Sequence, residues 1–235
     1  TPTTSLAREK ASADELWAYA EREYKSANPL VKLLLNNFFS TLGRIVALLE
    51  PDDRVLEVGC GPGVSSRRIH AMLSGQQFEI SDVDERFVRK LRELDGHMPI
   101  RQESVLSLQR PAKSFDCVLL LEVLEHIEQY ELALSELFRV SRKYVVISVP
   151  NEPLWRILNM ARGMYLLQWG NTPGHVNHWS RRNFVGLVSR FGTVLKVYTP
   201  MPWIIVLARA SGDAQHPEVR PSTRSCTKGA FIEHF

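Results

Sequence analysis

The sequence predicts an α/β fold: a doubly wound, mostly parallel sheet of seven strands with helices on both faces. Two observations predict it. Between residues 54 and 149, short and uniformly apolar segments alternate with segments of helical character, and strands without a polar face belong to a sheet that is covered on both sides. Three glycines follow the first apolar segment, where a chain of this fold turns from a strand into a helix.

Two helices are expected before the sheet, over residues 12–26 and 29–49. Asn28 and Pro29 favour the start of the second one, because asparagine caps a helix and proline suits its first turn. This helix is the most apolar long segment of the chain, but polar residues such as Lys32 interrupt it. It is therefore expected to be a core or lid helix, and no stable insertion into a membrane is predicted.

The sheet and its helices follow in βαβ order. Strands are predicted over residues 54–58, 78–81, 99–102, 115–121 and 144–149, and helices over residues 64–73, 85–94 and 130–140. This alternation of strand and helix is typical of a doubly wound sheet.

The pattern changes after the fifth strand. Residues 153–169 are predicted to be helical, residues 170–177 to form a loop, and Ser180 to cap a further helix. Two closing strands, over residues 193–198 and 204–209, are expected to pair antiparallel at the edge of the sheet.

These elements predict three parts in the chain. Residues 1–50 are expected to form an N-terminal helical lid and residues 51–210 the main domain, in which residues 151–179 are a helical insertion on the substrate side. Residues 211–235 are polar and without periodicity, so we expect a flexible tail.

Composition and charge exclude several classes of protein. The net charge is +3 with both signs interspersed, which is not the footprint of a nucleic-acid-binding protein. The three cysteines are too few and too scattered for a disulfide framework or a zinc cluster. Their apolar surroundings favour reduced thiols and a cytoplasmic location.

The glycine turn is the most informative motif, with residues 54–63 reading Arg-Val-Leu-Glu-Val-Gly-Cys-Gly-Pro-Gly. Gly59, Gly61 and Gly63 tolerate positive φ and have no Cβ that would block a ligand. The helix behind them points its unpaired amides back at the turn. Strand, turn and helix together predict a nucleotide-type cofactor at the carboxyl edge of the sheet.

An acidic residue at the end of the second strand strengthens this prediction. Asp82 follows the turn by about twenty residues, where a carboxylate can accept hydrogen bonds from both ribose hydroxyls of an adenosine. Its neighbour Asp84 is assigned to the cap of the next helix. Glu57, inside the first strand, can orient the turn or receive a cationic group of the ligand. The alternative is structural: the glycines make a tight turn and Asp82 caps a helix.

With these residues the chain resembles class I S-adenosylmethionine-dependent methyltransferases of the small-molecule type, and among them the O-methyltransferases of ubiquinone biosynthesis. The resemblance covers residues 50–150 well. It rests on Glu-Val-Gly-Cys-Gly-Pro-Gly (57–63), Ile-Ser-Asp (80–82), Ser-Phe-Asp (114–116) and Glu-Val-Leu-Glu-His-Ile (122–127). It implies a Rossmann-like fold, S-adenosylmethionine as cofactor, and an enzyme that transfers methyl groups.

The resemblance also implies roles for individual residues. The glycine turn faces the methionine part of the cofactor and Asp82 its ribose, and Leu121 contributes main chain after the fourth strand. Ser104 stands where the family often has an aspartate at the adenine, so that contact can come from Ser104, Glu103 or main chain. The expected cofactor-binding residues are Glu57, Gly59, Gly61, Gly63, Asp82, Val83, Ser104, Val105 and Leu121.

Candidate proton acceptors follow the fourth strand. If residues 122–127 begin a helix, then Glu122, Glu125 and His126 share one of its faces beside the cofactor. His175, in the insertion, can meet them there. A base is needed only if the acceptor is a hydroxyl that must lose its proton. We expect His126 or His175 to take that proton, with Glu122 as a further catalytic candidate; the alternative is that these residues only anchor loops.

The same four side chains admit a second interpretation. Two carboxylates and two histidines can bind a divalent metal, and they fall on positions that match the small-RNA 2′-O-methyltransferases, which this arrangement resembles. The short chain and its low net charge favour the metal-free interpretation, so no metal site is predicted. A non-catalytic, cofactor-binding subunit is a third possibility.

The acceptor is expected to bind beside the insertion. Aromatic and long aliphatic side chains there can line a pocket for an aromatic, polyketide, lipid or quinone-like molecule, or they can simply pack the insertion onto the sheet. They are Trp155, Met160, Met164, Tyr165 and Trp169, together with Phe38 and Phe39 of the preceding helix. The sequence thus predicts a methyltransferase that acts on a small molecule at a hydroxyl, without nucleic acid, and it leaves the oligomeric state open.

Overall fold

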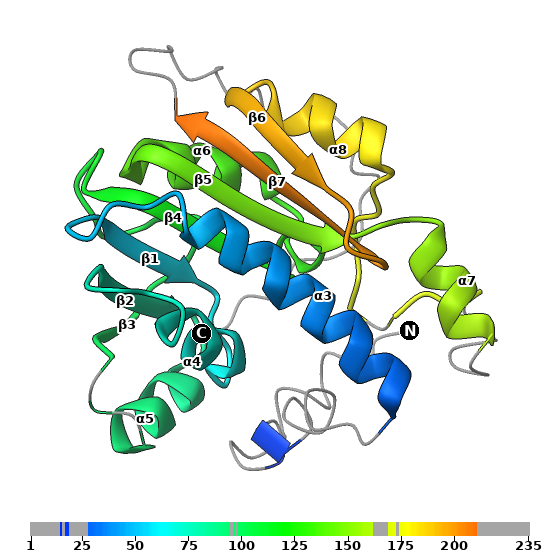
Figure 1. The fold of residues 1–235 in the computed structure, drawn as a ribbon, viewed down its shortest axis with the longest axis horizontal. Coiled ribbons are helices and arrows are strands. Elements are labelled where there is room, and N and C mark those ends of the chain that lie inside the picture. Colours follow the sequence, from blue (N-terminus) through cyan, green and yellow to red (C-terminus); the bar gives the residue numbers. More distant parts are fainter. Residues whose placement is uncertain are drawn as a thin grey trace, which may run out of the picture.

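One sheet of seven strands forms the centre of the molecule, with the order β3-β2-β1-β4-β5-β7-β6 (Figure 1). β1 to β5 are parallel, and β7 pairs antiparallel with both β5 and β6. The strands are β1 (Arg54–Val58), β2 (Gln77–Asp82), β3 (Ile100–Gln102), β4 (Phe115–Leu121), β5 (Ser141–Pro150), β6 (Gly192–Tyr198) and β7 (Trp203–Ala210). The predicted doubly wound sheet with an antiparallel edge pair is confirmed.

The structure is a computed structural model. It describes residues 28–94, 96, 98–161, 169–172 and 174–210, together with Glu15, Trp17 and Ala18. Several expected features lie outside the described residues: most of the helix at 12–26, the tail at 211–235, the side chains of Met164 and Tyr165, and Cys226.

The helices begin close to where the sequence places them; those predicted at 29–49 and 64–73 end three residues earlier, and those at 85–94 and 130–140 have the predicted bounds. Asn28 caps α3, since its side chain accepts a hydrogen bond from the amide of Leu30 (2.9 Å), and Ser180 accepts one from the amide of Asn183 at the start of α8. The helices are α3 (Pro29–Val46), α4 (Val64–His70), α5 (Glu85–Leu94), α6 (Tyr130–Val140), α7 (Leu154–Ala161) and α8 (Arg181–Val188).

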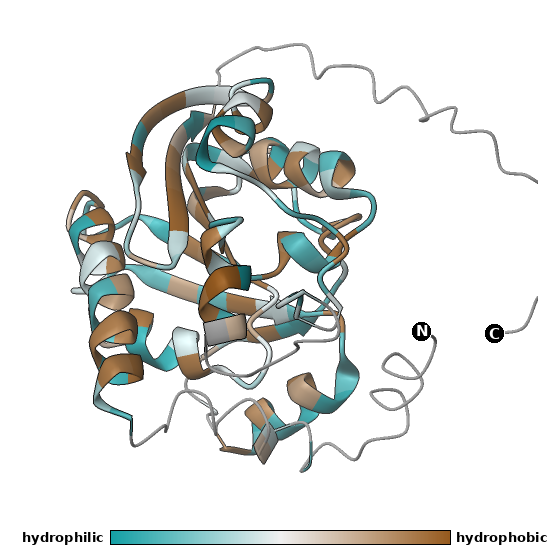
Figure 2. Cartoon of the chain, turned by 90° about the vertical axis from the view of Figure 1, so that its right-hand side faces the viewer, coloured by the Kyte–Doolittle hydropathy of each residue, from teal (hydrophilic) through white to brown (hydrophobic). Residues whose placement is uncertain are grey.

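Helices cover both faces of the sheet because successive residues of a strand point to opposite sides. In β1, Val55 packs into the cluster that holds Leu42 of α3, whereas Leu56 packs into the cluster of Leu134 in α6 and Phe184 in α8. The helices alternate hydrophilic and hydrophobic residues, as expected for elements with one buried side (Figure 2).

The cysteines and the hydropathy of the helices agree with the expectations. Cys60 and Cys117 are buried free thiols. Within the part of the chain that the structure describes, no helix is both long enough and apolar enough to cross a membrane.

Candidate cofactor and acceptor site

The glycine turn, Asp82 and the segment after β4 lie at one edge of the sheet. Val58, the last residue of β1, pairs with Ser81 of β2 and with Leu120 of β4, so the three strands end together. The carboxyl edge of a parallel sheet is where α/β folds bind their ligands.

The glycine turn combines tight packing with open space. Gly59, Gly61 and Gly63 have φ values of 73°, 51° and 70°, a conformation that favours glycine. A Cβ on Gly59 would lie 2.7 Å from the side chain of Val123, and one on Gly63 would lie 2.7 Å from Leu91. A Cβ on Gly61 would meet nothing within 4 Å. Gly59 and Gly63 are therefore required by packing, and Gly61 borders room for a ligand.

Asp82 holds the tip of this turn. Its carboxylate is 8% exposed and accepts hydrogen bonds from the amides of Gly61 (2.7 Å) and Asp84 (2.8 Å). Burial raises the pKa of Asp82, and these two amides oppose the rise. The cap of α5 falls to Asp84, as expected, because its carboxylate accepts from the amide of Arg86 (2.9 Å).

Glu57 is tied to the first turn of α4. It is 1% exposed, and its two oxygens accept from the hydroxyls of Ser65 (2.6 Å) and Ser66 (2.5 Å). Burial raises the pKa of Glu57 to about 7, the two hydroxyls oppose this, and Asp82 adds to it. Neither serine was predicted from the sequence. The available signal was a pair of hydroxyls in the first turn of the helix that follows a strand containing a carboxylate.

The adenine side of the edge contains Val83, Ser104 and Val105. Val83 is 65% exposed directly after Asp82, and Val105 is buried. The Ser104 hydroxyl accepts from the amide of Leu106 (3.2 Å), which shapes the turn.

Glu103, an alternative adenine contact, already has a partner. Its carboxylate is buried and forms a bidentate ion pair with Nε of Arg110 (3.0 and 3.1 Å). Arg110 also binds Glu79 (2.6 Å), which in turn binds Arg54 (3.1 Å). This chain of ion pairs favours Ser104 or main chain for the adenine contact.

Asp116, one of the residues that carry the resemblance, lies at the other end of β4. It is 1% exposed, accepts from the amide of Arg54 (3.0 Å) and pairs with Arg142 (2.6 Å). Since these partners belong to β1 and β5, Asp116 joins three strands at the amino edge and has no place in the site.

The helix expected over residues 122–127 is wrong. β4 ends at Leu121, Glu122 has φ 56°, and only a single 3-10 turn, η1 (Leu124–His126), follows. The amide of Glu122 bonds to Ser148 of β5 instead (3.1 Å to its hydroxyl). A left-handed residue interrupts a helix, so helical spacing does not place Glu122 beside Glu125 and His126.

Glu122 nevertheless faces a polar environment of its own. Its carboxylate accepts a hydrogen bond from the Ser148 hydroxyl (2.7 Å) and one from the side chain of Trp203. Burial raises the pKa of Glu122 to about 8, and both hydrogen bonds oppose the rise. Ser148 and Trp203 are site neighbours that sequence reasoning missed.

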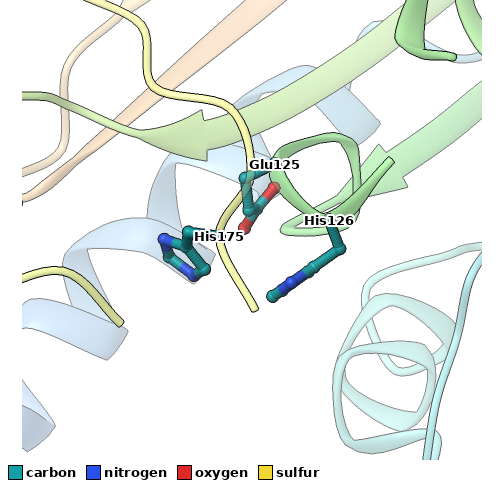
Figure 3. Close-up of side chains that lie close together, drawn as sticks. All are labelled: Glu125, His126 and His175. Carbon is teal, nitrogen blue, oxygen red and sulfur yellow. The ribbon is translucent and has the colours of Figure 1, made fainter. Parts of the chain in front are cut away.

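Three of the four candidate side chains do come together. Glu125, His126 and His175 each offer one possible ligand atom, and these atoms lie within 4.8 Å of one another (Figure 3). The rings of His126 and His175 meet edge to face, with 4.9 Å between their centroids. Glu122 is not a member of this group.

Hydrogen bonds fasten the loop of His175 to η1. The amides of Val176 (2.9 Å) and Asn177 (3.1 Å) both donate to the carbonyl oxygen of Glu125, and the Asn177 side chain donates to the carbonyl of Ile127 (2.7 Å). These bonds therefore hold together two segments that lie about fifty positions apart in the chain.

The charges of this cluster are unusual. Burial raises the pKa of Glu125 well above its ordinary value, and Glu122 adds to the rise. Burial, His126 and His178 together lower the pKa of His175 to about 3. His175 is therefore a neutral ring near pH 7 and a weak proton acceptor.

Aromatic side chains extend from the cluster toward α3. The ring of Trp155 lies 6.3 Å from His175 and 6.0 Å from Trp203, which is itself 5.0 Å from Phe38. Phe39 is buried beside Phe38, whereas Trp169 is 74% exposed. The insertion thus contributes Trp155, and not Trp169, to this aromatic row.

Residues 27–195 match a family model described as a methyltransferase domain. The fold resembles that of magnesium protoporphyrin IX methyltransferase from Synechocystis PCC 6803 with bound SAH (TM-score 0.62, 19% identity, 88% of this chain and 99% of that chain). It also resembles a SAM-dependent methyltransferase from Aquifex aeolicus (TM-score 0.60, 17% identity, 81% and 98%). A chain from a complex of the Haloferax volcanii Trm112 methyltransferase activator with a methyltransferase gives a TM-score of 0.64 (14% identity, 88% and 100%). No curated protein matches the chain.

Fold and family together define an enzyme of the class I S-adenosylmethionine-dependent methyltransferases. The chain belongs to the methyltransferase-domain family that its residues 27–195 match. The glycine turn fits the cofactor, since Gly61 borders open space where a nucleoside-bearing amino acid can approach main chain.

Proposed function

We propose that the protein transfers the methyl group of S-adenosylmethionine to a hydroxyl of a small molecule. One observation carries the proposal: the open glycine turn and the cluster of Glu125, His126 and His175, with Glu122 in the same segment after β4, lie at the same edge of the sheet.

The cofactor side would be held by groups that are already in position. The turn at Gly59, Gly61 and Gly63 would receive the methionine part beside Glu57, and Asp82 would bind the ribose through lone pairs that its amide contacts leave over. Val83, Ser104 and Val105 would enclose the base, and the main chain of Leu121 would add a contact after β4. When bound, the cofactor supplies an electrophilic methyl group on a positively charged sulfur.

The acceptor side would position a hydroxyl and receive its proton. Positioning alone can lower a barrier by roughly 7–11 kcal/mol. Glu122, with a pKa of about 8, has the basicity that suits proton transfer near neutral pH, and His126 follows in the same chain segment after β4. His175, whose pKa is lowered to about 3 by burial, His126 and His178, is a weak proton acceptor.

The acceptor itself is expected to be an apolar or aromatic small molecule. The row of Trp155, Trp203 and Phe38 leads from the cluster toward the start of α3, and aromatic walls with few polar groups are typical of small-molecule sites. We assign the boundary of this site to residues 151–179 and to the N-terminal helical part, where Leu30 and Leu33 of α3 are exposed.

The cofactor half of the proposal is tested by Gly61→Val. A valine at this position would fill the open space, so we expect the affinity for S-adenosylhomocysteine in calorimetry to fall at least about tenfold, the equivalent of 1.4 kcal/mol. Gly75→Val is the matched control, because Gly75 also has a positive φ (109°) but lies before β2, at the amino edge. Equal affinities of the wild type and Gly61→Val would contradict the proposal.

The acceptor half is tested by incubating the protein with cell extract and a methyl donor that carries an isotopic label in its methyl group. Mass spectrometry should show the label on an oxygen of a small molecule. Label found only on protein, nucleic acid or nitrogen would contradict this half and leave the cofactor half intact.

A further inference from the structure

We infer that the methyl acceptor carries a protonated amine, which binds in a cage formed by Glu122, Glu125, Trp155, His175 and Trp203. The inference rests on the proposed function in one respect, since the molecule that enters the cage is taken to be the acceptor. It adds the chemical class of that acceptor: an organic ammonium ion with an apolar or aromatic body.

The five side chains of the cage form a closed series of neighbours. The carboxylate of Glu122 accepts a hydrogen bond from the side chain of Trp203, whose ring centroid lies 6.0 Å from that of Trp155. Trp155 stacks on His175 with 6.3 Å between the centroids, and a nitrogen of His175 lies within 4.8 Å of a carboxylate oxygen of Glu125. Glu122 raises the pKa of Glu125, so the two carboxyl groups are neighbours as well.

Glu125 supplies a buried oxygen atom that has no partner. The residue is 2% exposed, and its Oε2 has no hydrogen-bond partner within the described part of the chain. The carboxyl group lies between the rings of His126 and His175 (Figure 3). A buried carboxyl oxygen is costly unless a donor reaches it, and an ammonium group offers up to three N–H donors.

The charges around the cage favour a cation. Among the described residues, no ion pair includes Glu122 or Glu125, and His175, with a pKa of about 3, is uncharged near pH 7. Burial raises the pKa of both carboxyl groups, and a cation beside them would favour their ionised forms. An ammonium ion therefore gains more from this cage than a neutral or anionic group of the same size.

The two indole rings favour an organic cation. Indole is the aromatic ring that attracts cations most strongly across its face. Trp155 is partly exposed, so its ring can contact a ligand, and Trp203 adjoins it in the aromatic row that continues to Phe38. The carbon atoms next to an ammonium nitrogen can pack on these rings while its N–H groups turn to the carboxylates, and the row offers an apolar wall to the rest of the acceptor.

Phenethylamine is the probe for the cage, and phenethyl alcohol, which has nearly the same shape without the charge, is its matched partner. In calorimetry with the full chain near neutral pH, the amine should bind at least about tenfold more tightly than the alcohol, which is 1.4 kcal/mol. Glu125→Gln keeps the shape of the side chain and removes its charge, so it should bring the two affinities together. Glu128→Gln is the control, because Glu128 is exposed and follows η1, and it should keep the preference of the wild type.

Three results of this experiment would overturn the inference. They are equal affinities of the folded wild type for amine and alcohol, no binding of the amine at millimolar concentration, or an equal loss of preference in Glu128→Gln. Thermal unfolding of each variant separates loss of the cage from loss of the fold. Glu125→Asp, which keeps the charge, should retain more of the preference than Glu125→Gln.

The isotopic label of the extract experiment separates the inference from the proposed function. A labelled O-methyl product that carries an amine should be retained by a cation-exchange resin at mildly acid pH. A labelled O-methyl product that passes through the resin would defeat the inference and leave the proposed function standing. Label on the nitrogen of a retained amine would defeat methylation at a hydroxyl and leave the cage standing.

Discussion

At the scale of single residues, the two carboxylates of the cofactor side have different tasks. Glu57 joins β1 to α4 through two serine hydroxyls, and Asp82 joins β2 to the tip of the glycine turn. Within the described part of the chain neither forms an ion pair; serine hydroxyls bind Glu57, and main-chain amides bind Asp82. Each difference is open to measurement.

Glu57 is expected to make stability depend on pH. Its pKa rises from 4.5 to about 7 on folding, so between these values the unfolded chain has lost the proton that the folded chain keeps. The free energy of unfolding should therefore fall as the pH rises through this window, by on the order of 3 kcal/mol. In Glu57→Gln, which does not titrate, denaturant unfolding from pH 4.5 to about pH 8 should show a smaller fall.

The control for this experiment is Glu79→Gln. Burial raises the pKa of Glu79, but the hydrogen bonds from Arg110 and Arg54 outweigh burial, so the pKa is lowered. The stability that Glu79 contributes is therefore lost as the pH falls, whereas the stability that Glu57 contributes is lost as the pH rises. Identical pH profiles of the wild type and Glu57→Gln would show that Glu57 is ionised throughout.

Asp82 and Asp84 form a matched pair for cofactor binding. Asp82→Ala removes the expected ribose ligand and the contact to Gly61, so the affinity for S-adenosylhomocysteine in calorimetry should fall at least about tenfold. Asp84→Ala removes the cap of α5 and the ion pair with Arg86 and should cost about 1 kcal/mol of stability with little change in affinity. The reverse order of effects would assign the ribose to Asp84.

At the scale of elements, the loop of residues 174–177 and the turn η1 behave as one unit. Asn177 bridges them, since its side chain donates to the carbonyls of Ile127 (2.7 Å) and Leu124 (3.4 Å). This unit places His175 beside His126, so its integrity should matter for the acceptor and not for the cofactor.

Asn177→Ala is expected to loosen this unit. The variant leaves the carbonyl of Ile127 without the donor that Asn177 supplies, which costs about 1–3 kcal/mol, and hydrogen exchange at the amides of residues 176 and 177 should accelerate. Asn171→Ala is the control. Among the described hydrogen bonds that concern this loop, the side chain of Asn171 takes part only in the one with His178. Unchanged exchange in Asn177→Ala would show that the two amide bonds to Glu125 suffice.

The sequence predicts such elements unequally well. The strands were recognisable because they are apolar throughout, and α3 and α8 because Asn28 and Ser180 are strong caps. The segment after β4 was not recognisable in this way. The left-handed Glu122, whose amide bonds to Ser148 in another strand, prevents a helix there. A local pattern carries no information about a partner in β5.

At the scale of the whole molecule, the same limit applies to the site. The contact between the glycine turn and Asp82 was largely predictable, since Glu57, the glycines and Asp82 lie within about thirty residues of one another in strand order. The acceptor side depends on contacts between β4, the insertion and β7. Trp203 reaches Glu122 from the far end of the chain, and no spacing in the sequence indicates it.

The two cores of the molecule should contribute strongly to its stability. Leu134 of α6 is fully buried in the cluster that also holds Phe184, so Leu134→Ala should lower the free energy of unfolding by about 2–5 kcal/mol. The control, Leu195→Ala, changes a side chain in β6 that is 40% exposed and should cost much less. Similar losses in denaturant unfolding would contradict the two-faced core.

In the proposed function, different loops at the carboxyl edge of the sheet bind the two substrates, and this bears on how such enzymes acquire new substrates. In that function, the loops after β1, β2 and β3 would serve the nucleoside, whereas η1, the insertion and the β6–β7 turn would serve the second substrate. Because the ion pairs of Asp116 hold the strands together from the opposite rim, we expect these ion pairs to persist when the insertion is exchanged. A chimaera that carries the insertion of a relative should have that relative's specificity for the methyl recipient and keep its own affinity for the methyl donor.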